Sequence, residues 1–249
     1  MSSEKTTALV IRQADFSESS RVVTFFTKDF GKVPLLAKGA KRLKGPFESA
    51  LDLLSACDIV FLRKSSGSLG ILTEAHLRER FHNAGCELSR LYGGYYIAEL
   101  LEGLTEEFDP HPGLYEEALH GLHRLDDVTV EPQLAIVLFE FAVLRETGHL
   151  PNFEECVVCG RAADSRAPYA FWVSQGGILC RECQKQDYRR NRLRMKSVEL
   201  LQLWSQPEPI ILEHVDASIL KEISNVTTTA VTYNLGRPPK TLRYLKQFR

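Results

Sequence analysis

Residues 21–37 read RVVTFFTKDFGKVPLLA, and this stretch decides how the first third of the chain folds. Two runs of β-branched, aromatic and aliphatic residues flank a short polar segment, which is a pattern typical of paired strands. The polar segment is Lys28-Asp29-Phe30-Gly31, in which the glycine can adopt the positive φ that tight turns need. The stretch therefore predicts a β-hairpin with strands at 20–27 and 32–37.

Further strand-like runs lie on both sides of this hairpin. One precedes it at 6–14, and two follow at 51–63 and 68–77, joined by the turn-like Lys64-Ser65-Ser66-Gly67. Five short strands within about 75 residues suit a small barrel, for which the five-stranded OB-fold is the natural candidate.

The period of the apolar residues changes to a helical one after Phe81. Helices are expected at 88–104, 114–125, 132–148, 197–204 and 216–235. A loop-rich segment with a short strand at 169–174 interrupts them. Because helices stand before and after this segment, we expect one helical domain that carries it as an insert.

Four of the six cysteines lie in this insert, as Cys156-x2-Cys159 and Cys180-x2-Cys183, with 20 residues between the pairs. Two such pairs at this spacing predict one tetrahedral Zn²⁺ site rather than disulfides. Four thiolates fill the coordination shell and leave no position for a reactive water, so the expected zinc is structural. The remaining Cys57 and Cys86 are expected to be inert.

The predicted fold class is therefore α+β, with an N-terminal five-stranded OB-fold barrel followed by a helical domain carrying a four-cysteine zinc-finger insert. The predicted domains are a nucleic-acid-binding OB-fold at 1–80 and the helical domain at 81–249, with the insert at about 151–188.

The net charge of −1 conceals a segregation of charge along the chain. Residues 1–80 hold 13 Lys and Arg against 9 Asp and Glu, residues 81–150 hold 3 against 13, and residues 151–249 hold 15 against 10. Two basic ends thus flank an acidic middle. This asymmetry favours an anionic partner at the ends, although random variation of surface charge is the simpler alternative.

Two clusters of cations are candidate contacts for nucleic-acid phosphates. The first, between the third and fourth expected strands, contains Lys38, Lys41, Arg42 and Lys44, and the second follows the cysteines and contains Arg189, Arg190 and Arg192. A third series, spaced by three residues from Arg237 to Arg249, would form a basic stripe if it were helical. Solvated loops without a ligand are the alternative. Five phenylalanines are candidates for base stacking, most of them expected in the core: Phe16, Phe25, Phe26, Phe30 and Phe47.

The order of these features resembles the RecO family of recombinational DNA-repair proteins over essentially the full chain. The matching segments are Val10-Ile11-Arg12, Glu18-Ser19-Ser20-Arg21, Thr24-Phe25-Phe26-Thr27, Gly31, Lys38-Gly39-Ala40-Lys41-Arg42, the two cysteine pairs, Leu235-Gly236-Arg237 and Lys240-Thr241-Leu242-Arg243-Tyr244-Leu245. The chain departs from the family pattern at Pro238-Pro239.

The resemblance implies a DNA-binding mediator that binds single- and double-stranded DNA and anneals complementary strands. It also implies RecR and single-stranded-DNA-binding protein (SSB) as partners, with RecA assisted indirectly onto SSB-coated strands. Arg12 and Arg21 join the first cation cluster as expected phosphate contacts. The chain has no signal-peptide pattern and no apolar run of 18 residues, so the expected location is the bacterial cytoplasm, at the nucleoid and not in a membrane.

Two other functions remain open at this point. The protein could be mainly a scaffold for repair complexes that contacts DNA only incidentally. An enzyme acting on nucleic acid is the weakest hypothesis, because the sequence offers no nucleophile with a base and no open metal site. We therefore expect a protein without catalytic residues.

Overall fold

The computed structural model describes residues 2–42, 47, 50–63, 69–81, 87–164, 168–184, 192–206, 215–245 and 247. The chain divides into two compact units, Met1–Pro132 with Pro239–Arg249 and Gln133–Pro238. The first unit contains both the barrel and two long helices. The domain boundary expected at residue 80 lies instead at the point where strands give way to helices. That division into domains stays a prediction.

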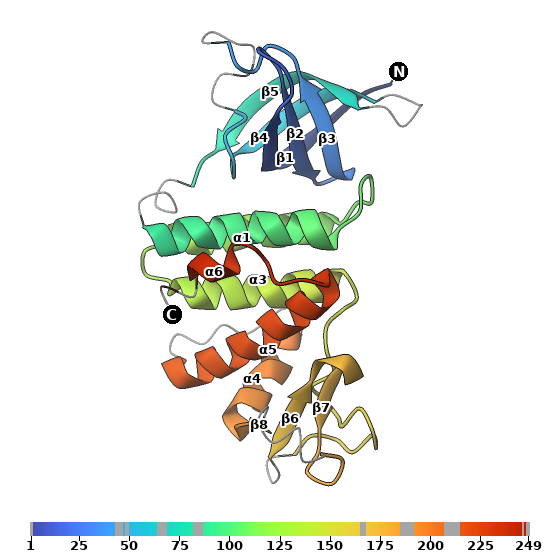
Figure 1. The fold of residues 1–249 in the computed structure, drawn as a ribbon, viewed down its shortest axis with the longest axis vertical. Coiled ribbons are helices and arrows are strands. Elements are labelled where there is room, and N and C mark those ends of the chain that lie inside the picture. The colour runs from blue at the N-terminus through green and yellow to red at the C-terminus, as the bar shows by residue number, and fades with distance from the viewer. Residues whose placement is uncertain are drawn as a thin grey trace. The chain divides into compact units, whose positions relative to one another are not determined.

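Five strands of the first unit close into a barrel (Figure 1). They are β1 (Ser2–Asp15), β2 (Arg21–Thr27), β3 (Gly31–Ala37), β4 (Ala56–Arg63) and β5 (Gly70–Glu79), in the order β1-β2-β3-β5-β4. Neighbouring strands are antiparallel except β3 and β5, which pair in parallel at Leu35↔Gly70 and Leu36↔Ile71. The predicted fold class is confirmed, including the hairpin of β2 and β3.

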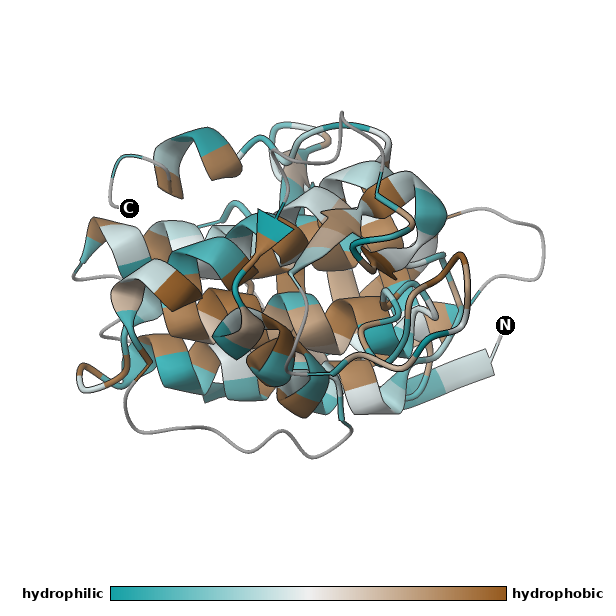
Figure 2. Cartoon of the chain, turned by 90° about the horizontal axis from the view of Figure 1, so that it is seen from below, coloured by the Kyte–Doolittle hydropathy of each residue, from teal (hydrophilic) through white to brown (hydrophobic). Residues whose placement is uncertain are grey.

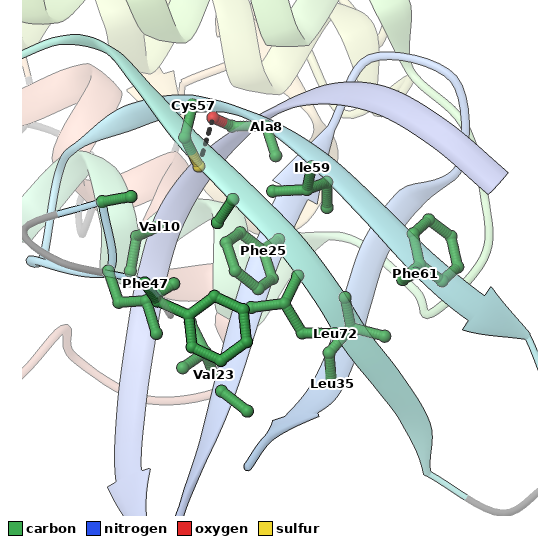
Figure 3. Packing of buried hydrophobic residues seen from close by; sticks show 14 of the residues in the cluster. Ala8, Val10, Val23, Phe25, Leu35, Phe47, Cys57, Ile59, Phe61 and Leu72 are labelled. Carbon is green, nitrogen blue, oxygen red and sulfur yellow. Dashed lines mark hydrogen bonds between the residues drawn. The ribbon is translucent and has the colours of Figure 1, made fainter. Parts of the chain in front are cut away.

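The barrel core is built from alternate residues of the strands, because successive side chains point to opposite faces of a sheet. In β3, for example, Val33, Leu35 and Ala37 are buried while the residues between them are partly exposed. Phe25, Phe61 and Leu72 fill the interior from other strands (Figure 3). The barrel is therefore filled by side chains, so a ligand would bind on its outside or at its loops.

Cys57 belongs to this core, and its thiol donates to the carbonyl oxygen of Ala8 at 3.7 Å, as drawn in Figure 3. Burial raises the pKa of this thiol to about 12. The side chain therefore stays protonated and behaves as a small apolar residue. The other cysteine expected to be inert, Cys86, lies outside the described residues.

The fourth strand begins later than predicted, at Ala56 rather than Leu51. The intervening residues form a turn in which Leu54 has a φ of 68° and donates its N–H to Val10 O at 2.9 Å. Leu51 nevertheless lies in the barrel core. The apolar run thus indicated burial correctly, but a turn that packs on the core produces the same composition as a strand.

The helices of the first unit are α1 (Leu88–Leu104), α2 (Pro112–Asp126) and the single turn α6 (Leu242–Leu245). Lys32 of β3 donates to the carbonyl oxygens of Glu102 and Thr105, both at 2.6 Å, and so satisfies acceptors at the end of α1. Glu99 of α1 accepts the backbone N–H groups of Lys240 and Thr241 at 2.7 and 2.9 Å. The segment after Pro238-Pro239 is thereby attached to α1.

In the described part of this tail, the only helix is the short α6. The backbone from Arg237 to Thr241 is not helical, and residues 246, 248 and 249 lie outside the described ranges. The series of cations spaced by three residues therefore does not form a continuous helical stripe over its described part.

The second unit consists of α3 (Pro132–Glu146), α4 (Met195–Ser205), α5 (Ala217–Leu235) and a small sheet ordered β7-β6-β8. The sheet strands are β6 (Tyr169–Trp172), β7 (Gly177–Leu179) and β8 (Arg192–Leu193), and a 3₁₀ turn, η2 (Val173–Gln175), joins β6 to β7. Figure 2 shows brown, apolar segments alternating with teal ones along the helices.

Aromatic contacts attach the cysteine segment to the helices of its own unit. Phe153 packs against Phe141 of α3 and Phe171 of β6, with ring centroids 6.4 and 6.2 Å apart. Trp204 of α4 completes the group, 6.2 Å from Phe141 and fully buried. The segment is thus an insert that shares a core with α3 and α4. Within the described ranges, no helix combines the length and apolar character needed to cross a bilayer.

Candidate nucleic-acid interface and metal centre

A group of charged side chains lies at the end of the barrel where β1 turns into β2. Asp15 is paired across the two strands with Arg21, whose Nε lies 3.2 Å from Asp15 Oδ1. The second oxygen, Oδ2, accepts from Lys41 Nζ at 3.0 Å. One carboxylate therefore joins a cation from β2 to a cation from the loop after β3.

Backbone contacts hold the two loops together at this point. Lys41 donates its backbone N–H to Ser19 O at 3.1 Å, and its Nζ lies 3.4 Å from Ser17 O. Lys41 and Arg21 lower the pKa of Asp15, the hydrogen bond from Lys41 contributing most. Asp15 thus stays ionised at neutral pH, and both cations are held beside it.

Lys38 and Arg42 complete the described part of the first cation cluster. Both are exposed, and a turn closed by the bond from Arg42 N to Gly39 O at 3.1 Å places them on either side of Gly39, whose φ is 77°. Within the described ranges, neither side chain has an ion-pair partner. We call Arg21, Lys38, Lys41 and Arg42 the loop cations below.

Of the other expected phosphate contacts, the structure describes Arg12 and Arg192, and neither is joined to Asp15. Arg12 pairs with Glu102 of α1, with an N···O distance of 3.1 Å, and is not joined to Asp15. Arg192 belongs to the second compact unit, where it is exposed in β8 and lines a pocket with Trp172 and Glu222. Lys44, Arg189 and Arg190 lie outside the described residues.

The five candidate stacking residues divide sharply by exposure. Phe25 and Phe26 are fully buried, Phe47 is 6% exposed, and Phe30 packs edge-on against Phe61, at a centroid distance of 5.5 Å. Phe16, beside Asp15 in the loop between β1 and β2, is 63% exposed. It is thus the exposed aromatic side chain among the five.

The four cysteine sulfurs of the second unit lie within 4.8 Å of one another and could hold a metal ion. Cys159 Sγ and Cys180 Sγ are 3.8 Å apart. A tetrahedral ion with metal–sulfur bonds of about 2.3 Å, the length typical of zinc, requires sulfurs roughly 3.8 Å apart. The donor set and its spacing therefore fit a tetrahedral ion.

Two tight turns place these sulfurs. In the first, Gly160 adopts a φ of 68° and donates its N–H to Cys156 O at 2.8 Å. In the second, Cys180 follows β7 directly, and Cys183 donates its N–H to Cys180 O at 3.1 Å. Each turn brings the two cysteines of one Cys-x2-Cys pair together, which is the spacing on which the predicted site rests.

The thiols differ in their tendency to ionise. Burial raises the pKa of Cys183 to about 12, and hydrogen bonds with the other three thiols act in the same direction. Burial acts likewise on Cys156, but backbone N–H groups of Cys180, Cys159 and Val158 outweigh it and lower the pKa to about 6. Backbone donors thus favour a thiolate in the cluster, which is the form that ligates metal.

An ion pair connects the two cysteine turns on the surface, with Arg161 2.8 Å from Glu182. Both side chains are more than half exposed, so the pair contributes little to stability. The geometry of the centre is set by the turns and the aromatic core below them.

Sequence reasoning missed Asp15 as part of the cation group. The sequence did indicate the contact between Asp15 and Arg21, because a short loop between the expected strands 6–14 and 20–27 brings the two residues opposite each other. The contact with Lys41 joins segments 26 residues apart, and no local pattern indicates it.

Comparisons with known proteins agree with this architecture. Residues 1–81 match the family model described as Recombination protein O N terminal, and residues 87–243 match Recombination protein O C terminal. The chain is similar to the DNA repair protein RecO of Rhodopirellula baltica, with 39% identity over 94% of this chain and 82% of the relative. It is also similar to proteins of the same name from Listeria monocytogenes serotype 4b, with 31% identity over 81% of this chain and 76% of the relative, and from Halalkalibacterium halodurans, with 30% identity over 80% and 76%.

Proposed function

Because the chain belongs to the RecO family of DNA-repair proteins, we propose that it binds single- and double-stranded DNA as a recombination mediator and not as an enzyme. The observation that carries this proposal is the group of loop cations at one end of an OB-type barrel. OB-folds bind oligonucleotides through the loop between their first two strands and the adjoining face. Here that loop contacts Lys41 directly.

The loop cations suit a phosphodiester backbone for two reasons. Lys38 and Arg42 are exposed, so a phosphate reaches them without displacing buried structure. Arg21 and Lys41 already bind a carboxylate, Asp15, whose oxygens have the charge and hydrogen-bonding character of a phosphate. We expect Arg12 to contribute less, because it pairs with Glu102 of α1 and is not joined to Asp15 and the other loop cations.

We extend the proposal to the partners that the family resemblance implies. The protein would bind RecR and SSB, assist the loading of RecA onto SSB-coated single strands, and anneal complementary strands. These activities require binding but no covalent bond to be made or broken. They would take place at the bacterial nucleoid in the cytoplasm. Neutralisation of phosphates by the loop cations favours annealing, since it reduces repulsion between two strands.

We further propose that Cys156, Cys159, Cys180 and Cys183 hold one structural Zn²⁺. The support is the all-sulfur donor set and the 3.8 Å separation of Cys159 and Cys180. Four thiolates leave no open coordination position, so the ion would stabilise the insert and not activate a substrate.

The proposed DNA binding is tested by replacing the two loop cations that have no described ion-pair partner. For single strands, the slope of log K against log salt changes by about 0.7 for each phosphate contact, so Lys38→Ala with Arg42→Ala should reduce it by about 1.4. Affinity at low salt should fall by about tenfold. Fluorescence anisotropy of a labelled single strand, titrated at several salt concentrations, measures both quantities.

The control is Lys5→Ala with Lys28→Ala, which removes the same charge near the other end of the β1–β2 pairing, where Ala8 faces Thr27 and Lys28 pairs with Glu116. We expect the slope of this variant to stay near that of the parent protein. If both double variants bind alike, the loop cations are not the interface. If the parent protein itself binds SSB but shows no salt-dependent affinity for DNA, the scaffold function is correct instead.

A further inference from the structure

The loop between β1 and β2 carries an aromatic side chain that the barrel core does not use. Phe16 is 63% exposed, whereas Phe25 and Phe26 in the same barrel are fully buried. No aromatic contact to Phe16 occurs among the residues that the structure describes. Its ring is therefore available to a ligand.

Hydrogen bonds fix the backbone that presents this ring. Phe16 donates its N–H to Ser20 O at 3.0 Å, and Ser17 donates to the same oxygen at 3.2 Å. Ser20 N in turn bonds the Ser17 hydroxyl at 3.2 Å. A backbone closed in this way loses little conformational freedom when the residue that it carries meets a partner.

The backbone that carries Phe16 also lies next to the loop cations. The residues on either side of Phe16, Asp15 and Ser17, both accept from Lys41 Nζ, at 3.0 and 3.4 Å. Asp15 binds Arg21 as well. An aromatic face beside cations is the combination that proteins use to bind single strands, where bases stack and phosphates pair with Lys and Arg.

From these contacts we propose that Phe16 is a stacking platform for an unpaired base, so that the site at the β1–β2 loop prefers single-stranded to duplex DNA. This inference rests on the proposed DNA binding by the loop cations. A duplex keeps its bases stacked on one another and offers only phosphates to the loop, whereas a single strand offers a base face to Phe16 as well.

The test compares two substitutions of the same residue. Phe16→Ala should weaken binding of a thymidine oligomer by about 5- to 150-fold, the range expected for the loss of one stacked base, and should leave duplex binding and the salt slope unchanged. Phe16→Trp should restore single-strand binding, because a larger aromatic ring also stacks. An oligomer of the same length without bases should bind the parent protein and Phe16→Ala equally.

Two controls separate stacking from other effects. Phe16→Leu keeps an apolar side chain without a π face, and Tyr233→Ala removes an aromatic ring that is 56% exposed in the other compact unit. We expect Phe16→Leu to behave like Phe16→Ala, and Tyr233→Ala to behave like the parent protein.

The outcomes distinguish this inference from the proposed function on which it rests. If Phe16→Leu binds the thymidine oligomer as well as the parent protein does, or if Phe16→Ala weakens duplex and single strand equally, the stacking role is wrong. If Lys38→Ala with Arg42→Ala reduces the salt slope while Phe16→Ala changes nothing, DNA binding stands and stacking fails. If neither variant changes binding, the proposed interface fails too.

Discussion

Arg21 and Asp15 face each other at the last residue pair of the β1–β2 hairpin, with the guanidinium Nε 3.2 Å from the carboxylate. The same carboxylate holds Lys41. Two of the four loop cations are therefore bound to an internal anion, and a phosphate must compete with that anion for them. Both partners of the Arg21–Asp15 pair are at least one-third exposed, so the exchange requires no buried group to be uncovered.

This competition predicts that Asp15→Asn strengthens DNA binding. Removing the carboxylate charge releases Arg21 and Lys41 for phosphate, so the salt slope for a single strand should steepen by up to about 1.4. Affinity should rise several-fold at low salt and less at high salt, where ions screen the charges. Anisotropy titrations of the variant at several salt concentrations measure the change.

The control for this variant is Asp52→Asn, which removes an exposed carboxylate that pairs with Arg80 at 2.7 Å in the same unit. It changes the net charge equally but does not touch the loop cations, so its slope should match that of the parent protein. Weaker binding by Asp15→Asn would mean that the carboxylate positions the cations for DNA and does not compete with it.

The second prediction concerns the contribution of Gly31 to the stability of the fold. Its φ is 65°, and a Cβ at this position would lie 1.9 Å from Asp109 O, a backbone atom that cannot rotate away. Gly31→Ala should therefore lower the free energy of unfolding by at least about 3 kcal/mol, because a left-handed conformation and a clash combine. Urea denaturation followed by circular dichroism measures this value.

Gly148→Ala separates the two causes. Gly148 has a φ of 72°, but a Cβ there would meet nothing within 4 Å, so only the backbone conformation opposes alanine. The expected cost is about 1–2 kcal/mol. Equal costs for the two variants would show that the segment at Asp109 moves aside and that the close approach to Gly31 is not required.

The fold could be predicted from the sequence wherever a local pattern determines it. The turn at Gly31 and the two strands that it joins are both visible in residues 21–37. The start of β4 could not be predicted, since Leu51 and Leu54 are as apolar as a strand but lie in a turn fixed by hydrogen bonds with Val10. Such bonds join distant segments, and composition does not encode them.

The candidate site shows the same division. The cysteine spacing was enough to predict that four sulfurs meet, because each pair lies in one tight turn. Composition indicated Lys38, Lys41 and Arg42 as candidate contacts and the family resemblance added Arg21, but neither indicated the partners of these cations. Arg12 and Arg21 look equivalent in the sequence, yet Arg12 binds Glu102 of α1 and Arg21 binds Asp15. Exposure separated Phe16 from the other phenylalanines, and only the packed barrel determines exposure.

The third prediction concerns the metal content of the four-cysteine centre and its effect on stability. The parent protein should contain one zinc ion per chain, and Cys180→Ser should lose it, because an alcohol replaces one of four thiolate ligands. Zinc binding to such sites is worth roughly 10–16 kcal/mol in peptides, which is as much as a domain's whole stability. The melting temperature of the second unit should therefore fall by at least about 15 °C.

Mass spectrometry of the metal content and thermal unfolding followed by circular dichroism check these two effects. Val158→Ser is the matched control, because Val158 lies between the first two cysteines and its side chain is 59% exposed. This variant should retain zinc and melt like the parent protein, since its backbone N–H still reaches Cys156. A Cys180→Ser protein with a full zinc ion and an unchanged melting temperature would contradict the assignment, because the fourth sulfur would then be dispensable for both metal and fold.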